Sequence, residues 1–395
     1  MDYSYLHRDC WLEIDLDILA ANFMAMKKLV GPSVKIMPAV KANAYAHGIV
    51  ACGMMLEKCG ADYLGVGNID EGILLRKHGV KMPLLIFAGN LISEVADVYI
   101  KYHLIPTVFT YEQAKSINDA TSSFFPIFIK IDTGRGRLGI NAEDFPNLFE
   151  KISKLSKIKV EGVYSHMCPV DWPDKKSSDY AQWQFNRFQG AMEGIESAAK
   201  KIPFRQLANT PASIAFPRLR LTGICPGRAI WGFSPLEKRE GHPNLEYPMI
   251  AWKSRLLHVQ EVLGGKFGEG FSTVKLDTPK RIGVMAGGIS DGISTAQSHG
   301  KVLVCGHKVP VASSICLEHT ILDLTNCPEA KPGDEVVIFG KQGDEEITMD
   351  EVRCFWKKDL MSFWTGITPH VQRLYFSKGH PVAVSYDDEL KDLSK

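Results

Sequence analysis

The sequence has no excess of charge of either sign, no long apolar run and no signal-peptide core. Its 46 basic and 45 acidic residues nearly cancel, so no overall field attracts nucleic acid or an anionic membrane. Apolar stretches such as PLLIFAG are far shorter than the roughly 20 residues that span a bilayer. The N-terminal segment MDYSYLHRDC lacks the apolar core of a signal peptide. We therefore expect a cytoplasmic protein that acts on a small molecule, without nucleic-acid or membrane partners.

The nine cysteines are an odd number, and none of them forms a CxxC pair. Disulfide frameworks favour even numbers, and zinc or redox sites favour closely spaced pairs. The cysteines are therefore expected to be mostly reduced thiols, and no metal site is predicted.

Eight apolar runs of strand composition alternate with amphipathic segments between residue 33 and about residue 232. The runs occupy residues 33–41, 61–68, 83–89, 105–109, 126–132, 159–166, 205–209 and 219–225. Alternation of this kind is typical of βα units. It predicts an α/β protein with a closed parallel (β/α)8 TIM barrel.

Beyond residue 245 the pattern changes to longer alternating stretches joined by Gly, Pro and Asp turns, which predicts a mainly antiparallel β domain. The charged, turn-rich segment 237–246 separates the two parts. We expect a barrel domain over residues 1–240 and a C-terminal β domain over residues 241–395. Residues 1–12 could pack with the second domain.

Six reactive side chains lie at the ends of predicted barrel strands. They are Lys41, Lys130, Asp132, His166, Asn209 and Cys225. Each alone is compatible with a solvated loop charge or a structural hydrogen bond. Together they point to one site, because barrel enzymes work at the carboxyl ends of their strands.

Lys41 lies between the apolar run IMPAV and the segment KANAYAHG, so its amine is expected in a partly apolar mouth. Desolvation lowers an amine's pKa and makes it a nucleophile and base. Asn209 and Thr210 precede a short helix suited to phosphate. Gly227 permits close backbone approach, and Arg228 adds a positive charge. These features describe a pyridoxal 5'-phosphate site with Lys41 as Schiff-base partner.

Several motifs resemble the alanine racemases, a family of fold-type III pyridoxal-phosphate enzymes. VKANAYAHG resembles the cofactor-lysine motif, and KIDTGRGRLGI at 130–140 resembles the substrate-side loop. WLEIDLDIL, EGVYSHM, ANTPAS, PGRAIWG and PGDEVVIFG follow in the family's order. The resemblance implies an amino-acid racemase that binds pyridoxal phosphate and forms a homodimer with shared active sites.

The resemblance also implies roles for individual residues. Tyr45 and Thr210 would lie near the phosphate, and His166 against the ring. Lys130 occupies the position that can be carbamylated and paired with an arginine, here Arg137, which orients the substrate carboxylate.

Two positions next to the reaction depart from the family. In GGISDGI, residues 287–293, Ile289 stands where the family has the tyrosine of GYADG, which serves as the second base. Cys225 stands where the family has an arginine beside the pyridine nitrogen. A thiol or a thiolate there would change how much charge the ring absorbs, and a thiolate would favour a protonated ring.

Further departures lie on the cofactor and substrate sides. CPGR resembles the EPGR of the basic amino acid decarboxylases, which makes Arg228 a phosphate-ligand candidate. Leu317 and Glu318 replace a Met-Asp pair of the β domain, which places Glu318 among the substrate residues. PHVQR, residues 369–373, replaces Tyr-Arg-Val-Pro-Arg.

Three hypotheses follow. The first is a racemase or epimerase with Lys41 on one face and a replacement second base, Cys316, His319 or His370, on the other. The second is a one-base enzyme: an aldolase, dehydratase, decarboxylase or transaminase. The third is an inactive cofactor-binding homologue, since site residues and not the fold decide the reaction.

Overall fold

The computed structural model describes most of the chain as two compact units. The described residues are 5–88, 91–168, 175–236, 240–263, 265–267, 274–276, 279–294, 300–312, 315–387 and 389–393. The barrel unit comprises Ile18–Ala44 and Cys52–Tyr247, and the β unit comprises Met1–Asp17, Tyr45–Ala51 and Pro248–Lys395. The domain boundary after residue 240 stays a prediction, because a compact unit in space need not be one continuous stretch of chain.

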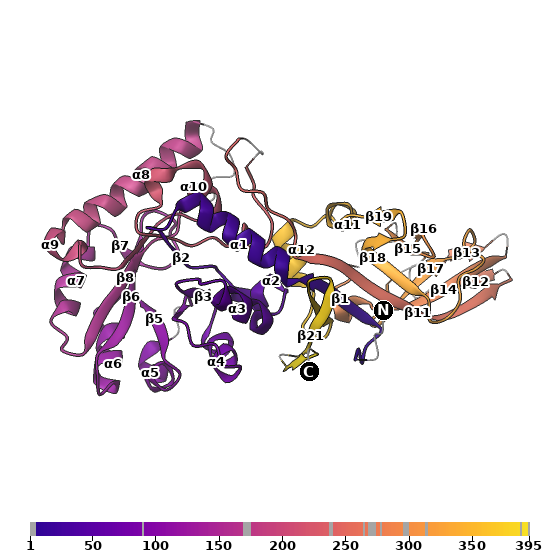
Figure 1. The fold of residues 1–395 in the computed structure, drawn as a ribbon, viewed down its shortest axis with the longest axis horizontal. Helices are drawn as coiled ribbons and strands as arrows, with labels where there is room; N and C mark the ends of the chain where they lie inside the picture. Colours follow the sequence, from indigo (N-terminus) through magenta and orange to yellow (C-terminus); the bar gives the residue numbers. More distant parts are fainter. Residues whose placement is uncertain are drawn as a thin grey trace. The chain divides into compact units, whose positions relative to one another are not determined.

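The barrel unit contains the eight parallel strands that the sequence predicts, which confirms the fold class (Figure 1). The strands are β2 (Lys35–Ile36), β3 (Leu64–Val66), β4 (Leu84–Ile86), β5 (Leu104–Val108), β6 (Phe125–Asp132), β8 (Ile158–Tyr164), β9 (Phe204–Gln206) and β10 (Gly223–Ile224). Their spatial order is β2-β10-β9-β8-β6-β5-β4-β3, and the short strand β7 (Ile140–Asn141) pairs with β6. A parallel bridge between Ala39 and Gly65 joins the two end strands and closes the barrel.

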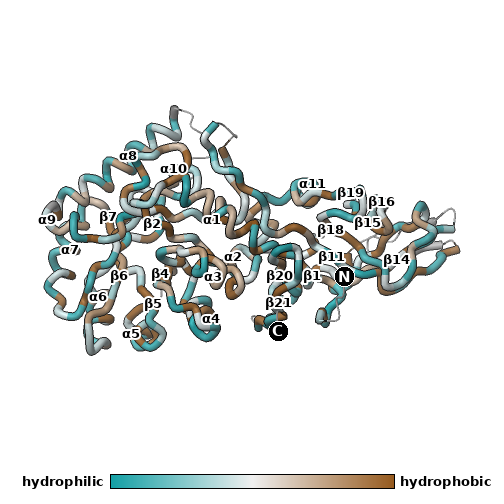
Figure 2. Tube along the Cα trace, in the orientation of Figure 1, coloured by the Kyte–Doolittle hydropathy of each residue, from teal (hydrophilic) through white to brown (hydrophobic). Residues whose placement is uncertain are grey.

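Helices connect the strands of the barrel. They are α1 (Leu16–Val30), α2 (Lys41–Tyr45), α3 (Ile49–Lys58), α4 (Ile69–Lys77), α5 (Ile92–Lys101), α6 (Tyr111–Ala120), α7 (Phe145–Ser153), α8 (Lys175–Glu193), α9 (Glu196–Ala199) and α10 (Thr210–Ala215), with the 3-10 turn η1 (Pro217–Leu219). Three of the described barrel helices, α4, α6 and α10, begin at polar caps, and Asn209 caps α10. Asn68 accepts a hydrogen bond from the Glu71 N–H, and Thr110 and Gln113 form a capping box. Figure 2 shows that apolar and hydrophilic residues both occur along these helices.

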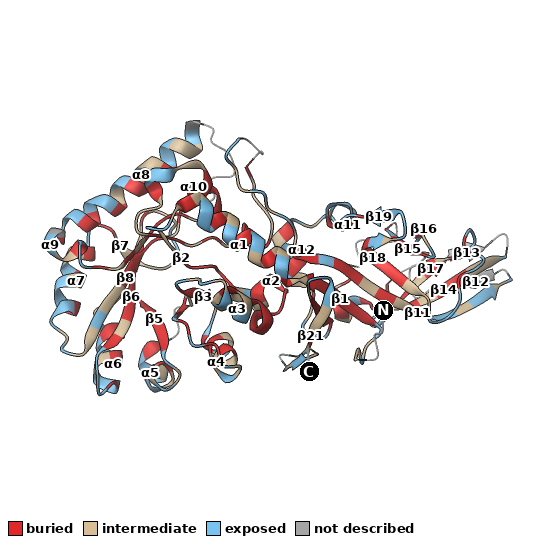
Figure 3. Ribbon diagram, in the orientation of Figure 1, coloured by how far each residue is buried: buried red, intermediate tan, exposed pale blue. Residues whose placement is uncertain are grey.

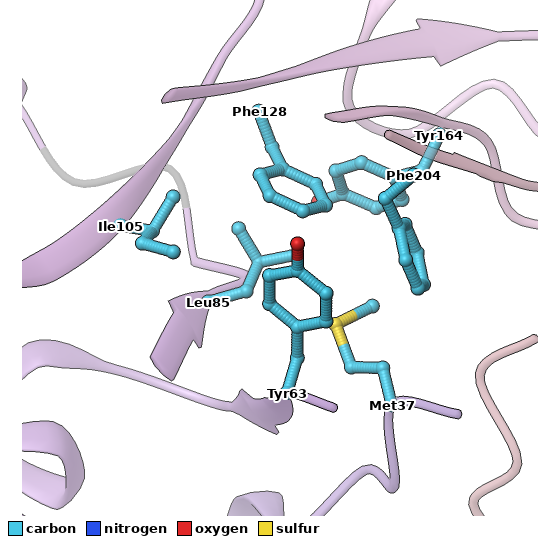
Figure 4. Packing of buried hydrophobic residues seen from close by; sticks show 7 residues of the cluster. All are labelled: Met37, Tyr63, Leu85, Ile105, Phe128, Tyr164 and Phe204. Atoms are coloured by element: carbon cyan, nitrogen blue, oxygen red, sulfur yellow. The ribbon is translucent and has the colours of Figure 1, made fainter. Parts of the chain in front are cut away.

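A layer of large side chains fills the barrel (Figure 4). Its members are Met37, Tyr63, Leu85, Ile105, Phe128, Tyr164 and Phe204. The Tyr63 and Phe204 rings meet edge to face with centroids 5.0 Å apart, an arrangement that adds about 0.5–1.5 kcal/mol to the burial term. Gly162 makes room for this layer, because a Cβ there would lie 2.2 Å from the Phe128 ring. Cys225 packs against the same layer, so the core supports one wall of the candidate site.

The β unit is built on an 11-stranded, mainly antiparallel sheet, as predicted. Its main order is β16-β15-β18-β11-β1-β20-β21-β22, and β14, β17 and β19 pair alongside. These strands are β1 (Cys10–Asp15), β11 (Met249–Val262), β14 (Lys280–Ala286), β15 (Lys301–Val304), β16 (His307–Pro310), β17 (His319–Asp323), β18 (Glu335–Gln342), β19 (Glu345–Ile347), β20 (Gln372–Ser377), β21 (His380–Tyr386) and β22 (Glu389–Asp392). The unit also holds the hairpin β12 (Gly265–Phe267) and β13 (Val274–Leu276), and helices α11 (Met349–Phe355) and α12 (Leu360–Gly366).

The N-terminal strand β1 belongs to this sheet and not to the barrel. It pairs antiparallel with β11 and parallel with β20, which lies near the other end of the chain. Five of its six residues are buried, as Figure 3 shows for the centre of the sheet. Among the described residues, no helix is long and apolar enough to cross a membrane.

Candidate active site

Lys41 sits at the start of a strained backbone turn. The five residues after it, Ala42 to Ala46, all have φ between 52° and 66°. The left-handed conformation costs a residue other than glycine roughly 1–2 kcal/mol, so neighbouring contacts must hold the turn. The Ala44 N–H donates to the Val40 carbonyl at 2.8 Å, and the Asn43 N–H donates to Glu71 Oε1 at 2.7 Å. Backbone strain of this kind is typical of functional sites.

Glu71 anchors the turn from helix α4. Its Oε2 accepts a hydrogen bond from the Gly67 N–H at 2.9 Å. A Cβ at Gly67 would lie 2.8 Å from that oxygen and 3.1 Å from the Lys41 Cβ, so glycine is needed there. Burial raises the pKa of Glu71, and the backbone N–H bonds oppose that rise. Sequence reasoning missed Glu71, whose sole signal is its position in the first turn of the helix after β3.

The two lysines of the site share one electrostatic environment. Burial lowers the pKa of Lys41, and Arg137 and Arg135 lower it further, whereas Cys225 and Glu71 oppose them. Burial, followed by Arg137, lowers the pKa of Lys130 to about 8. The Lys130 Nζ lies 5.5 Å from the centre of the Tyr164 ring. Both amines therefore give up a proton more readily than a solvated lysine, which suits a nucleophile and base.

The loop after β6 is organised by one carboxylate. Asp132 Oδ1 accepts hydrogen bonds of 2.8 Å from the N–H groups of Gly134 and Arg135. Its Oδ2 accepts 2.9 and 3.2 Å bonds from those of Gly136 and Arg137. Four bonds to one side chain fix the backbone that carries both arginines. The sequence predicted Arg137 as a site residue and missed Arg135.

His166 is electrically neutral in this environment. Burial and the charges of Arg135 and Arg137 lower the pKa of His166 to about 3. A neutral imidazole suits packing against an aromatic ring better than proton donation, in line with the role that the family resemblance implies.

Exchanging His166 for glutamine is expected to make the protein more resistant to mild acid. Between about pH 6.5 and pH 3 the unfolded chain binds a proton at His166 and the folded chain does not, so this residue weakens folding as the pH falls. His166→Gln should reduce the stability lost between pH 7 and pH 5 by about 1–2 kcal/mol. Urea unfolding at both pH values measures the difference; equal losses in the two proteins would show that His166 is protonated when folded.

Cys225 is a neutral thiol. Burial raises the pKa of Cys225 to about 12, although Lys41 and Lys130 pull it down. A half-buried thiol that packs against apolar side chains tends to keep its proton, which favours the thiol over the thiolate of the two forms considered for this residue. Its N–H donates to the Ala208 carbonyl at 3.0 Å, which places it beside the segment that leads from β9 to Asn209.

The two predicted phosphate segments lie side by side. The Thr210 Oγ1 accepts a hydrogen bond from the Ala229 N–H at 3.1 Å, so the start of α10 meets the turn that carries Gly227 and Arg228. Asn209 accepts a bond from the Ala212 N–H at 3.3 Å and caps α10.

The same turn is joined to the segment that leads from β2 to Lys41. The Ala39 N–H donates to the Pro226 carbonyl at 3.0 Å, and the Trp231 indole N–H donates to the Ala39 carbonyl at 3.3 Å. The Arg228 guanidinium lies 5.7 Å from the centre of the Phe233 ring. A contact between Arg228 and phosphate stays a prediction.

These residues fit pyridoxal phosphate. The donor set combines a buried amine of lowered pKa, a neutral imidazole and two arginines within electrostatic reach of both. That excess of positive charge suits the phosphate of the cofactor and the carboxylate of an amino acid.

The remaining predicted residues belong to the β unit. Ile289 lies in the 3-10 turn η3 (Ile289–Asp291) and is 41% exposed. Its N–H donates to the Cys316 carbonyl at 2.9 Å, and the Cys316 N–H donates to the His319 carbonyl at 2.9 Å. Glu318 and His319 are exposed. The backbones of Ile289, Cys316 and His319 therefore lie side by side.

His370 and Tyr45 complete the predicted set in the β unit. His370 Nδ1 is 3.2 Å from Asp387 Oδ1. Tyr45, the last residue of α2, is half-buried. The functional roles of the β-unit residues stay predictions.

The chain matches the family model described as the N-terminal domain of alanine racemase over residues 14–235, and the model of the C-terminal domain over residues 249–375. The chain belongs to the alanine racemase family. The family prediction is thereby confirmed, as are a racemase-type enzyme and the cofactor, since enzymes of this family use pyridoxal 5'-phosphate.

Relatives are similar over almost their whole length. The alanine racemase of Halothermothrix orenii is 33% identical over 94% of this chain and 98% of its own, and that of Desulfosudis oleivorans is 33% identical over 92% and 96%. Solved alanine racemases from Clostridium difficile 630 and Bacillus anthracis have TM-scores of 0.87 and 0.85 at 27% and 26% identity. The first covers 97% of this chain and 99% of its own, and the second, which has bound L-Ala-P, covers 96% and 98%.

Proposed function

We propose that the protein is an amino-acid racemase or epimerase in which Lys41 moves a proton at one face of the substrate α carbon and a group other than tyrosine serves the opposite face. The observation that carries this proposal is the placement of Lys41: a half-buried amine of lowered pKa, on a strained turn, within electrostatic reach of Arg137. Alanine is the first substrate to test, because the relatives named above are alanine racemases.

The chain's own residues divide the work. Pyridoxal phosphate, when bound, supplies the electron sink that acidifies the α proton. Arg137 orients the substrate carboxylate through a charge-assisted bidentate contact. Lys41 would remove the α proton from one enantiomer, and it would donate a proton to that same face when this enantiomer is formed. His166 would lie against the cofactor ring, and Thr210, Gly227 and Arg228 would hold its phosphate.

Lys130 can become negatively charged in this arrangement if its amine is converted to a carbamate. Its pKa of about 8 leaves a usable fraction of neutral amine at neutral pH. A neutral amine adds carbon dioxide to give a carbamate and releases one proton. As an amine, Lys130 carries a positive charge that repels Arg137. As a carbamate it would carry a negative charge, pair with the Arg137 guanidinium and orient it towards the substrate.

The second base is proposed to come from the turn next to Ile289. Isoleucine cannot carry a proton, whereas the Cys316 thiol and the His319 imidazole can. His319 is exposed, so in a homodimer with shared active sites it could enter the site of a second copy. Glu318 in the same turn would meet the substrate. His370 is the third candidate for the base.

One observation favours the second candidate function, a one-base enzyme. Cys225 is a neutral thiol where the family has a cationic arginine. Without that cation the ring nitrogen is freer to accept a proton, which strengthens the electron sink for bond cleavage or transamination. In this case only Lys41 would act on the α carbon.

Incubation of the holoenzyme with L- and D-amino acids in deuterium oxide tests these functions together. A racemase should exchange the α proton of both enantiomers and form the opposite one. Exchange of one enantiomer only, with a carbonyl product or carbon dioxide, would decide for the one-base enzyme. If no amino acid exchanges its α proton, the result would favour the third hypothesis, an inactive cofactor-binding homologue.

The same assay identifies the second base. Cys316→Ala and His319→Ala are compared, each changing one side chain of the same turn. The variant that has lost the base should retain exchange from one enantiomer and lose racemisation by about 10²–10⁴-fold. If both variants racemise at the wild-type rate, the base lies outside this turn.

A further inference from the structure

Four potential metal ligands gather in the β unit, outside the residues assigned to catalysis. The sulfurs of Cys305 and Cys327 and a carboxylate oxygen of Glu329 all lie within 4.8 Å of one another. Glu329 Oε1 is 3.6 Å from the Cys327 Sγ and 3.1 Å from the His307 Nε2. Two thiols and a carboxylate therefore converge, and the His307 imidazole lies next to the carboxylate.

The first ligand pair is held by the turn between β15 and β16. Val304 pairs with His307 across this hairpin, and Cys305 and Gly306 form its tip with φ of 50° and 78°. The Gly306 N–H donates to Gln342 Oε1 at 2.8 Å. The tip is thus fixed by protein contacts, and Cys305 accepts a left-handed conformation that is unfavourable for a residue with a side chain.

The second pair follows strand β17. The Cys327 N–H donates to the Leu324 carbonyl at 2.9 Å, and the Ala330 N–H donates to the Cys327 carbonyl at 3.3 Å. Cys327 is fully buried, whereas the Glu329 and His307 side chains are about half exposed. Backbone hydrogen bonds fix the buried Cys327 side of the pair, and solvent reaches the Glu329 side.

We propose that Cys305, His307, Cys327 and Glu329 form a binding site for zinc or a similarly soft divalent cation. Thiolate, imidazole and carboxylate are the ligands that zinc takes in four-coordinate structural sites. With bonds of about 2.0–2.3 Å, tetrahedral geometry places neighbouring ligand atoms roughly 3.3–3.8 Å apart. The 3.1 and 3.6 Å separations to Glu329 are close to that spacing.

Metal binding at this site exchanges existing contacts for coordinate bonds. The contacts of Cys327 and His307 with Glu329 and of Cys305 with Asp334 are replaced. The two thiol protons leave to solvent, and the imidazole binds in its neutral form with Nε2 unprotonated. The cation would tie the β15–β16 turn to the turn after β17, two segments about 20 residues apart in sequence. The lack of a CxxC pair predicted no metal site, and this proposal replaces that expectation, because the ligands come in two pairs with one residue between members.

Titration of the reduced, chelator-treated holoenzyme with Co²⁺ tests the proposal. We expect one equivalent to bind, with a thiolate-to-cobalt charge-transfer band and the intense visible bands of a tetrahedral site, and one equivalent of Zn²⁺ to displace it. The exposed changes Cys305→Ser and His307→Ala should each weaken binding by at least about 10–100-fold, and circular dichroism checks that both variants fold. Cys354→Ser, at an exposed cysteine of α11, is the matched control and should bind as the wild type does.

Three outcomes would overturn the proposal. They are no stoichiometric binding by the wild type, binding that survives Cys305→Ser and His307→Ala unchanged, and a Cys305–Cys327 disulfide in protein isolated without oxidant. The readout is the metal itself, so it is independent of whether the protein racemises amino acids.

Discussion

Lys41→Ala is expected to abolish both cofactor attachment and turnover. In the proposed function the amine is the bonding partner of the cofactor and the base on one face of the substrate, so its loss should lower kcat/KM by at least about 10²–10⁴-fold. The absorbance band of the lysine-bound cofactor should vanish from the purified protein. Spectra and steady-state kinetics measure the two effects separately.

Lys77→Ala is the matched control for this experiment. Lys77 is exposed in the last turn of α4, the helix that also carries Glu71. It should keep the cofactor band and the wild-type rate. A persistent, borohydride-reducible band in Lys41→Ala would mean that another lysine holds the cofactor.

Arg373→Met is expected to be the most destabilising single change in the β unit. Arg373 is 2% exposed, and its guanidinium donates to four backbone carbonyls. It bonds Ala46 at 3.0 Å, Pro369 at 3.0 Å and Thr368 at 3.1 Å, together with Val371. Methionine fills similar space but leaves these carbonyls unpaired, at a cost of about 3–5 kcal/mol in total.

Thermal unfolding of the two proteins measures this effect. The midpoint should fall by roughly 6–20 °C, since 1 kcal/mol corresponds to about 2–4 °C in a unit of this size. Arg353→Met is the control, because Arg353 bonds Asp350 at the surface and exposed ion pairs contribute about 0–1 kcal/mol. A midpoint within 2 °C of the wild type would show that water replaces the lost donors.

Arg373 also connects stability to the active-site turn. Ala46, whose carbonyl it binds, is the last of the left-handed residues after Lys41. A residue in that conformation relaxes when its contacts are removed. The family resemblance indicated that the segment PHVQR is altered. In the structure its arginine, Arg373, donates hydrogen bonds to backbone carbonyls.

The sequence by itself determined the features that depend on local order. The alternation of apolar runs with amphipathic segments predicted the eight barrel strands, because βα units repeat along the chain. The segment VKANAYAHG predicted the cofactor and made Lys41 the candidate that binds it, because a short motif in continuous sequence carries the family resemblance. The prediction that Ile289 replaces a tyrosine comes from the same kind of local comparison.

The tertiary structure decided what depends on residues far apart in sequence. Strand β1 joined β20 in the β unit, although more than 350 residues separate them, because sheet pairing is set by long-range packing. Glu71 became part of the Lys41 turn through hydrogen bonds to backbone N–H groups, which leave no motif. The surroundings of Cys225 raise the pKa of its thiol, and those surroundings cannot be inferred from one position in the sequence. Cys305 and Cys327 came together because two turns meet in space.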